Sequence, residues 1–250
     1  MSALKITYIG GPTMLLDFDG IRILTDPTFD PAPNDYPSGP VTLHKLASPA
    51  IPLEALGSFD YVLLSHDHHS DNLDRAGRES LPSATLVLTT REGAQRLGGN
   101  SVGLEPWQIR DIKTGDRTLR VVATPARHGP AGMDRGAVIG FVLFFTDSPE
   151  QSLYISVDTV WYEGVTEIAT LPCASRDLAY WRGACSRGRT IPLDHDFPEE
   201  AVHAAQVFSN AVIVPTHFEG WAHFSEGKDD ILRAFRKAGI IFCSCSGPRL

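Results

Sequence analysis

Three of the nine histidines in this 250-residue chain stand within four consecutive positions. They are His66, His68 and His69, and Asp71 and Asn72 follow in the same short stretch. A divalent metal needs several nitrogen or oxygen donors that converge on one point, and strand ends or anchored loops hold such donors best. Burying so many imidazoles without a metal or a polar partner would cost free energy. The cluster therefore predicts a metal centre.

The residues before the cluster predict how it is positioned. Tyr61–Ser65 is a largely apolar run, which is typical of a buried strand, and it would deliver His66 from its C-terminal end. Upstream, short apolar runs alternate with turn signals and predict further strands. These strands are Leu4–Ile9, Met14–Phe18 and Ile21–Thr25, with a tight turn at Asp19-Gly20 and a loop of four prolines from Pro31 to Pro40.

The rest of the chain mixes strands with helices. Further strands are predicted at Leu86–Thr89, Leu119–Thr124, Ala137–Phe145, Leu153–Val157 and Val212–Pro215. Helices are predicted at Arg91–Leu97, Trp161–Ala169, Phe197–Phe208 and Lys228–Ala238. Many strands followed by strands mixed with helices favour two stacked sheets with helices outside.

Composition limits the classes of function. The hydrophobic content of 42% and charged content of 21% are those of an ordinary globular domain. The net charge of −8 argues against a nucleic-acid or anionic-membrane binder, since both need a basic surface. We find no signal peptide and no apolar stretch long enough to span a membrane. The four cysteines suggest no disulfide framework, so we expect reduced thiols in the cytoplasm.

The segment Leu63–Asp74 resembles the signature of the metallo-β-lactamase superfamily. In that signature a strand ends in His-x-His-x-Asp-His, followed by Leu-Asp. The opening of the chain is similar to the branch that contains the L-ascorbate-6-phosphate lactonases, through Tyr8–Thr13 and the Thr25-Asp26-Pro27 turn. The resemblance implies an α/β fold, a four-layer αββα sandwich with two mixed sheets, formed by residues 1–250 as a single domain.

The resemblance also implies which residues bind metal. The third histidine ligand matches His128, the carboxylate that bridges two ions matches Asp158, and the final histidine matches His217. With Asp71 and the clustered histidines, these residues would hold one or two divalent ions, with zinc expected first and manganese or iron as alternatives. All lie near predicted strand ends, so we expect their side chains to converge.

Two departures from the signature affect the site. The run from His66 to Asp71 is one residue longer than the pattern, so His68 or His69 can take the second histidine position; counting back from Asp71 favours His69. Asn72 replaces the last histidine, and a neutral amide is a poor ligand for a transition metal. We therefore expect one firmly held ion and one that exchanges readily, and we expect Asn72→His to raise the retained stoichiometry towards two.

Residues 170–193 depart from the resemblance, which covers about 4–168 and 197–239. The family pattern has a strand in this region. This sequence has four arginines, two glycines and two cysteines there, without clean periodicity. The residues themselves favour an irregular surface loop.

The function implied is metal-assisted hydrolysis of a small-molecule ester, lactone or phosphodiester. Asp71 would accept the proton of the attacking water, and His223 would donate a proton to the leaving group or contact the substrate, unless its role is structural. One alternative is a non-catalytic or regulatory metal-binding protein, which Asn72 and the irregular segment make plausible. Another is an iron-dependent oxidoreductase of the same fold.

Overall fold

The computed structural model describes residues 4–132, 135–171, 178–182, 197–209 and 211–240. Its first sheet has six strands in the order β1-β2-β3-β6-β7-β8. These strands are β1 (Leu4–Gly10), β2 (Thr13–Phe18), β3 (Ile21–Thr25), β6 (Tyr61–Leu63), β7 (Leu86–Thr90) and β8 (Ser101–Leu104). The first three strands pair antiparallel, and β3, β6, β7 and β8 run parallel to one another.

The second sheet also has six strands, in the order β14-β13-β12-β11-β10-β9. They are β9 (Ile109–Thr114), β10 (Arg117–Pro125), β11 (Ile139–Phe145), β12 (Ser152–Ile155), β13 (Leu178–Arg182) and β14 (Val212–Thr216). Neighbours from β9 to β12 are antiparallel, whereas β12, β13 and β14 are parallel. Both sheets are therefore mixed.

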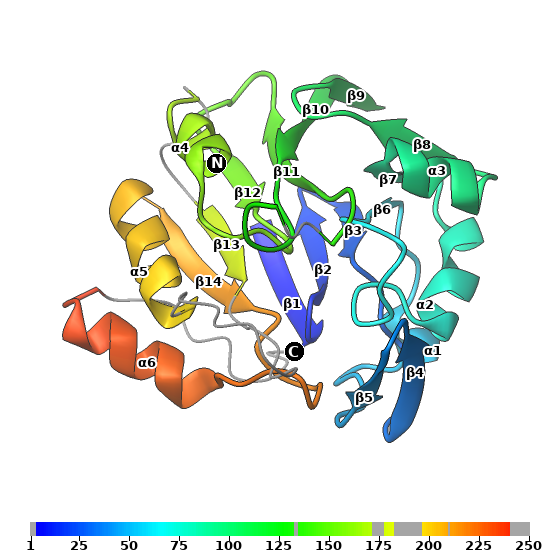
Figure 1. Cartoon of the computed structure of the whole chain (residues 1–250). Helices are drawn as coiled ribbons and strands as arrows, with labels where there is room; N and C mark the ends of the chain where they lie inside the picture. Colours follow the sequence, from blue (N-terminus) through cyan, green and yellow to red (C-terminus); the bar gives the residue numbers. More distant parts are fainter. Residues whose placement is uncertain (1–3, 133–134, 172–177, 183–196, 210, 241–250) are drawn as a thin grey trace.

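Helices cover the outer face of each sheet (Figure 1). On the first sheet lie α1 (Leu53–Leu56), α2 (Arg75–Ser80), the short 3-10 turn Leu81–Ser83 and α3 (Arg91–Leu97). On the second lie α4 (Glu163–Ala169), α5 (Phe197–Val207) and α6 (Lys228–Lys237). The predicted four-layer αββα sandwich is confirmed. None of the helices in the described ranges is long and apolar enough to cross a membrane.

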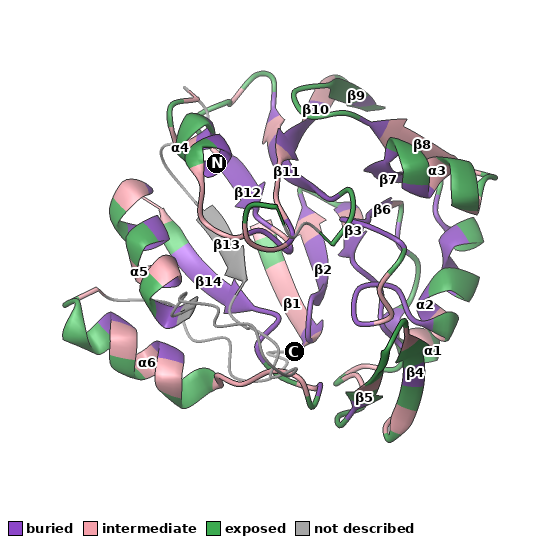
Figure 2. Ribbon diagram, viewed as in Figure 1, coloured by how far each residue is buried: buried purple, intermediate pink, exposed green. Residues whose placement is uncertain are grey.

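Strand β11 shows why the sequence folds into layers. Phe141 and Leu143 pack into the core between the two sheets, whereas Val142 packs into a separate core under the helices of the second sheet. Successive side chains of a strand point to opposite faces, so an apolar strand between two layers must be hydrophobic on both. Figure 2 shows central strands such as β2 and β11 mostly buried and the outer helix surfaces exposed.

The prediction of a plain loop from Pro31 to Pro40 was wrong. Strand β4 (Asn34–Ser38) pairs antiparallel with β5 (Val41–Lys45) as a separate two-stranded hairpin. A proline within a strand is tolerated where no further strand needs its missing N–H, and Pro37 lies in such a two-stranded ribbon.

The prediction of an irregular loop over 170–193 was also wrong in part. Strand β13 lies within it and pairs with β12 on one side and β14 on the other. A central parallel strand needs no alternating pattern, so periodicity gave no signal for it. Residues 172–177 and 183–193 of this segment lie outside the described residues.

Candidate metal centre

The candidate residues follow the C-terminal ends of strands at one edge of the sandwich. Strands β3 and β6 are parallel, so their C-terminal ends meet. Strands β10 and β12 share one direction, because β11 is antiparallel to both. Strand β14 has the same direction, because β12, β13 and β14 are parallel. Asp26 follows β3, the cluster from His66 to Asn72 follows β6, His128 follows β10, Asp158 follows β12 and His217 follows β14. This is where open α/β sheets commonly place ligands.

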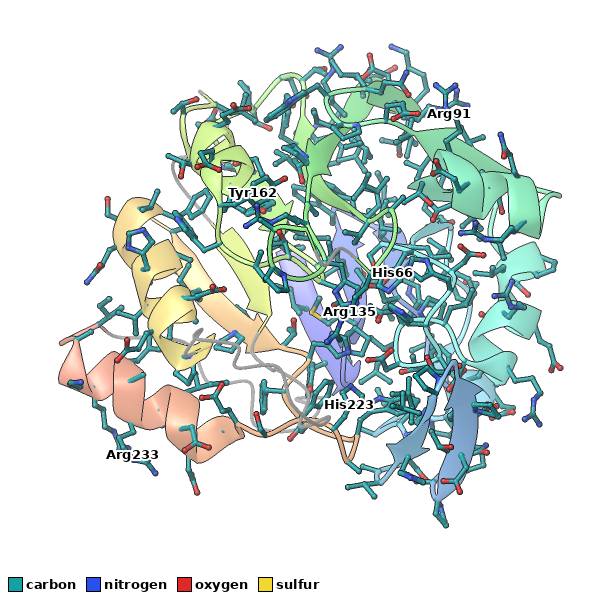
Figure 3. The ribbon with its side chains drawn as sticks, in the orientation of Figure 1. His66, Arg91, Arg135, Tyr162, His223 and Arg233 are labelled. Atoms are coloured by element: carbon teal, nitrogen blue, oxygen red, sulfur yellow. The ribbon has the colours of Figure 1, made fainter. Side chains whose placement is uncertain are left out.

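Three imidazoles form the histidine half of the site: His66, His69 and His128. One nitrogen of each lies within 4.8 Å of the others. The Nδ1 atom of His69 is 3.0 Å from Nε2 of His66 and 3.2 Å from Nε2 of His128. His66 and His128 are buried. Figure 3 shows His66 near the middle of the molecule.

The spacing of these nitrogens fits a metal ion. Two nitrogens bound to a tetrahedral zinc at about 2.0–2.1 Å lie about 3.3 Å apart. The observed separations of 3.0 and 3.2 Å are close to that value. Burial is the main reason why the pKa of the His66 imidazole lies well below its usual range. His66 is therefore neutral, which is the form that binds metal.

The two candidates for the second histidine position are placed differently. His69 lies in the histidine half, whereas Nε2 of His68 is 2.9 Å from the backbone oxygen of Arg135. His68 is also exposed. The extra residue in the loop thus brings His69 to the cluster and turns His68 towards the segment after His128.

The carboxylate half of the site consists of Asp71, Asp158, His217 and His223. Nδ1 of His217 is 2.8 Å from Asp158, and Nε2 of His223 is 3.1 Å from Asp71. Nε2 of His217 is buried without a hydrogen-bond partner and lies 3.7 Å from Asp71. His128 lies 3.9 Å from Asp158, which connects the two halves. The side chains expected to converge do lie together.

Neighbouring histidines control the charge of Asp71. Burial by itself would raise the pKa of this carboxyl. The hydrogen bond with His223 and the charges of His217 and His223 outweigh burial and hold the pKa of Asp71 well below its usual range. Asp71 is therefore an ionised acceptor at the centre of the carboxylate half.

A buried polar network lies behind the histidine half. The backbone N–H of Ser65 donates to Asp26 at 2.6 Å, and Nδ2 of Asn72 lies 3.4 Å from the other oxygen of Asp26. Burial, and secondarily the charge of Asp158, raises the pKa of Asp26 to about 8 against the lowering effect of these hydrogen bonds. Asp26 was not predicted as a site residue, and the Thr25-Asp26-Pro27 turn is the sequence signal that marks its position.

Strained backbone marks the same edge. Asp26, Val157 and His217 have φ values of 31°, 56° and 59°, a region that non-glycine residues rarely adopt. Such strain persists only where the surrounding structure holds it, and it concentrates at functional sites. Two of these strained positions, Val157 beside Asp158 and His217 itself, belong to the carboxylate half.

Two further contacts that hold the loops of the site in place were not predicted from the sequence. The buried Asp67 accepts a two-pronged hydrogen bond from Arg96, which fixes the loop that carries the histidines. In the hairpin β4–β5, the buried Lys45 pairs with Asp74 at 2.8 Å.

The same hairpin holds the segment that carries His223. The N–H of Leu46 donates to the oxygen of Gly220 at 2.7 Å, and the N–H of Ala222 donates to the oxygen of His44 at 2.9 Å. Since Lys45 is tied to Asp74, the hairpin links the His223 segment to the loop of Asp71.

Comparison with known proteins agrees with this geometry. A family model described as a beta-lactamase superfamily domain matches residues 21–218. The chain belongs to the metallo-β-lactamase superfamily. An uncharacterised protein of Mycobacterium bovis is 28% identical over 239 residues, covering 87% of this chain and 59% of the relative. The chain thus spans about three fifths of that relative's length.

Two other proteins match over most of both chains. A metal-dependent hydrolase of Caldivirga maquilingensis is 25% identical, covering 90% of this chain and 86% of the relative. The crystal structure of an isothiocyanate hydrolase from Delia radicum gut bacteria has a TM-score of 0.79 at 22% identity. It covers 98% of this chain and 97% of the other, and at that identity it shows the shared fold alone.

Proposed function

We propose that the protein is a metal-dependent hydrolase that acts on a small-molecule ester, lactone or phosphodiester. The observation that carries this proposal is the convergence of three imidazole nitrogens beside an ionised Asp71 and the His223 imidazole. His66, His69 and His128 would hold one divalent ion, zinc first by the chemistry of three nitrogen donors. Asp71, Asp158 and His217 would hold or orient a second. An ion bound there lowers the pKa of a water molecule and polarises the bond to be cleaved.

The protein's own residues then move the protons. Oδ2 of Asp71 accepts a proton from the attacking water, for which its low pKa keeps it ionised. Nε2 of His223, 3.1 Å from that oxygen, donates a proton to the leaving group. One water is consumed, the bond to the leaving group breaks, and the leaving group departs protonated. The proton taken up by Asp71 then passes to His223 across their contact, which restores both residues. Asp158 holds His217 in place through Nδ1.

A cavity lies next to the segment that carries His217 and His223, and none of the proposed metal ligands lines it. It has a volume of about 570 Å³, which lies in the range of ligand pockets. Phe218 and Trp221 line it, and the Trp221 ring lies 6.1 Å from the ring of His223. A lactone is one candidate, which the similarity of the opening segment to the lactonase branch supports. The net charge of −8 favours a small molecule over a nucleic acid.

The test is metal analysis of the purified protein together with a screen of chromogenic esters, lactones and phosphodiesters. We expect bound divalent metal and turnover of one class, both lost in His128→Ala and both retained in the control His44→Ala. His44 is a matched control because its imidazole is exposed and pairs with Asp35. Retained metal without turnover of any class would favour the non-catalytic alternative. A redox-active iron centre would favour the oxidoreductase, and a protein that binds no divalent ion would refute the proposal.

A further inference from the structure

Asn72 is engaged in hydrogen bonds away from the three histidines. Its side chain is fully buried, and Nδ2 lies 3.3 Å from Oγ of Ser65 and 3.4 Å from Oδ2 of Asp26. An amide nitrogen carries two N–H donors, so each can serve one of these acceptors. Asn72 therefore belongs to a buried network, beyond its position in the metal signature.

Ser65 connects this network to a proposed metal ligand. Its Oγ lies 2.8 Å from Nδ1 of His66, and its backbone N–H donates to Asp26. A hydroxyl oxygen has two acceptor positions. When the Asn72 amide uses one and Nδ1–H of His66 uses the other, Nε2 of His66 carries the free lone pair. That nitrogen is the one that faces His69 at 3.0 Å.

We propose that Asn72 is a positioning residue for the histidine half, which it serves by holding Ser65 so that His66 presents Nε2 to the ion. Partners that hold the second nitrogen of a ligating histidine fix its ring and its tautomer, and their loss typically lowers metal affinity 10–100-fold. The inference rests on the proposed metal centre. It changes the meaning of Asn72, because the residue then supports the first ion in addition to lacking a donor for the second.

The two interpretations of Asn72 predict opposite results for one variant. If Asn72 is only a missing donor, Asn72→His adds a second retained ion and leaves the first unchanged. If Asn72 positions Ser65, the imidazole of Asn72→His cannot replace the amide, because it lacks two N–H donors on one nitrogen. Asn72→His and Asn72→Ala then both weaken binding of the first ion by about 10–100-fold.

The experiment measures the dissociation constant of the first Zn²⁺ by competition with a chelator of known affinity, starting from metal-free protein. The variants are Asn72→Ala, Asn72→His, Ser65→Ala and the double variant Ser65→Ala with Asn72→Ala. Asn100→Ala is the matched control, because Asn100 also donates its amide to two buried acceptors, the oxygens of Leu81 and Ala84. We expect the control to bind Zn²⁺ like the unmodified protein.

A double-mutant cycle separates positioning from general damage to the fold. If Asn72 acts through Ser65, Asn72→Ala has little further effect on zinc affinity once Ser65 is alanine. In metal-free protein, the ¹⁵N chemical shifts of His66 should move towards the Nε2–H tautomer in Asn72→Ala and in Ser65→Ala. Ser65→Ala keeps Asp26 and its backbone hydrogen bond, so it serves as the test if Asn72→Ala does not fold.

Unchanged zinc affinity in Asn72→Ala, or a full effect of this substitution in the Ser65→Ala background, would overturn the inference. The proposed function would survive that outcome, since the unmodified protein would still bind zinc. If the unmodified protein binds no divalent ion, the proposed function itself fails.

Discussion

The two halves of the site hold their imidazoles in different ways. In the carboxylate half, His217 and His223 are each hydrogen-bonded to an aspartate. In the histidine half, Nε2 atoms of His66 and His128 approach Nδ1 of His69 at 3.0–3.2 Å. Nitrogen lone pairs that face one another repel unless a cation or a proton lies between them. The carboxylate half can keep its geometry through hydrogen bonds to its aspartates, whereas the histidine half needs a proton or an ion between its nitrogens.

This difference separates two tasks. The histidine half is suited to retaining metal, and the carboxylate half is suited to orienting water and moving protons. Asp158 contacts both, through His217 at 2.8 Å and His128 at 3.9 Å. The predictions that follow change the histidine half, the carboxylate half or the residues that support them.

The largest effect is expected for His69→Ala, which removes the nitrogen at the centre of the histidine half. Purified His69→Ala should retain almost no divalent metal, whereas His68→Ala should retain nearly the amount of the unmodified protein, because His68 faces the Arg135 backbone. Elemental analysis after desalting measures both. Greater metal loss in His68→Ala would show that His68 is the ligand.

Next in size is the effect of Lys45→Met on stability. This substitution leaves the buried Asp74 without its ion pair, and breaking a buried pair costs about 3–5 kcal/mol. The exposed pair of Arg91 with Glu105 provides the control, since Arg91→Ala should cost at most about 1 kcal/mol. Urea unfolding measures both free energies. Equal losses in the two variants would show that the buried Lys45–Asp74 pair contributes no more to stability than an exposed pair.

The carboxylate half should hold a second ion only weakly. Its two imidazoles already bind aspartates, and Asn72 donates its amide to Ser65 and Asp26. The desalted protein should therefore contain one ion per chain, and a second should appear in calorimetric titration with added metal. Two ions retained through desalting would contradict this.

The last prediction is a dependence of stability on pH in metal-free protein. Burial raises the pKa of Asp26 from 3.8 to about 8 in the folded state. The folded chain therefore binds a proton that the unfolded chain releases between these values. Stability from this group is complete below pH 3.8 and is lost as pH rises through about 8. The fall in melting temperature from pH 5 to 8.5 should be smaller in Asp26→Asn; an equal fall in both proteins would remove Asp26 as its source.

Much of the fold could be predicted because its elements have local signals. Helix α3 was predicted at its observed bounds, Arg91–Leu97, since Thr90 caps its start and Gly98 follows its end. Strand β3 was likewise predicted at Ile21–Thr25. Strand β13 could not be predicted, because it is defined by pairing with strands on both sides rather than by its own pattern.

The site shows the same division. Strand-end positions and the resemblance indicated that His66, His128 and Asp158 converge. The sequence could not indicate which groups the Asn72 amide contacts, because one of its hydrogen-bond partners is Asp26, 46 residues away. Nor could it show that Lys45 pairs with Asp74, since that contact depends on the unexpected hairpin. The signature thus predicted the proposed metal ligands. The residues that hold these ligands in place could not be predicted, because they depend on long-range contacts.

The contact between Asp71 and His223 joins residues 152 positions apart. One belongs to a loop of the first sheet and the other follows the last strand of the second. The site is therefore incomplete until nearly the whole chain has folded, so a nascent chain cannot acquire its full activity early. An ion that binds His66 and His128 would also join the two sheets and act like a crosslink between them. Its removal should then speed unfolding more than it changes the folding rate, if the sheets dock after the transition state.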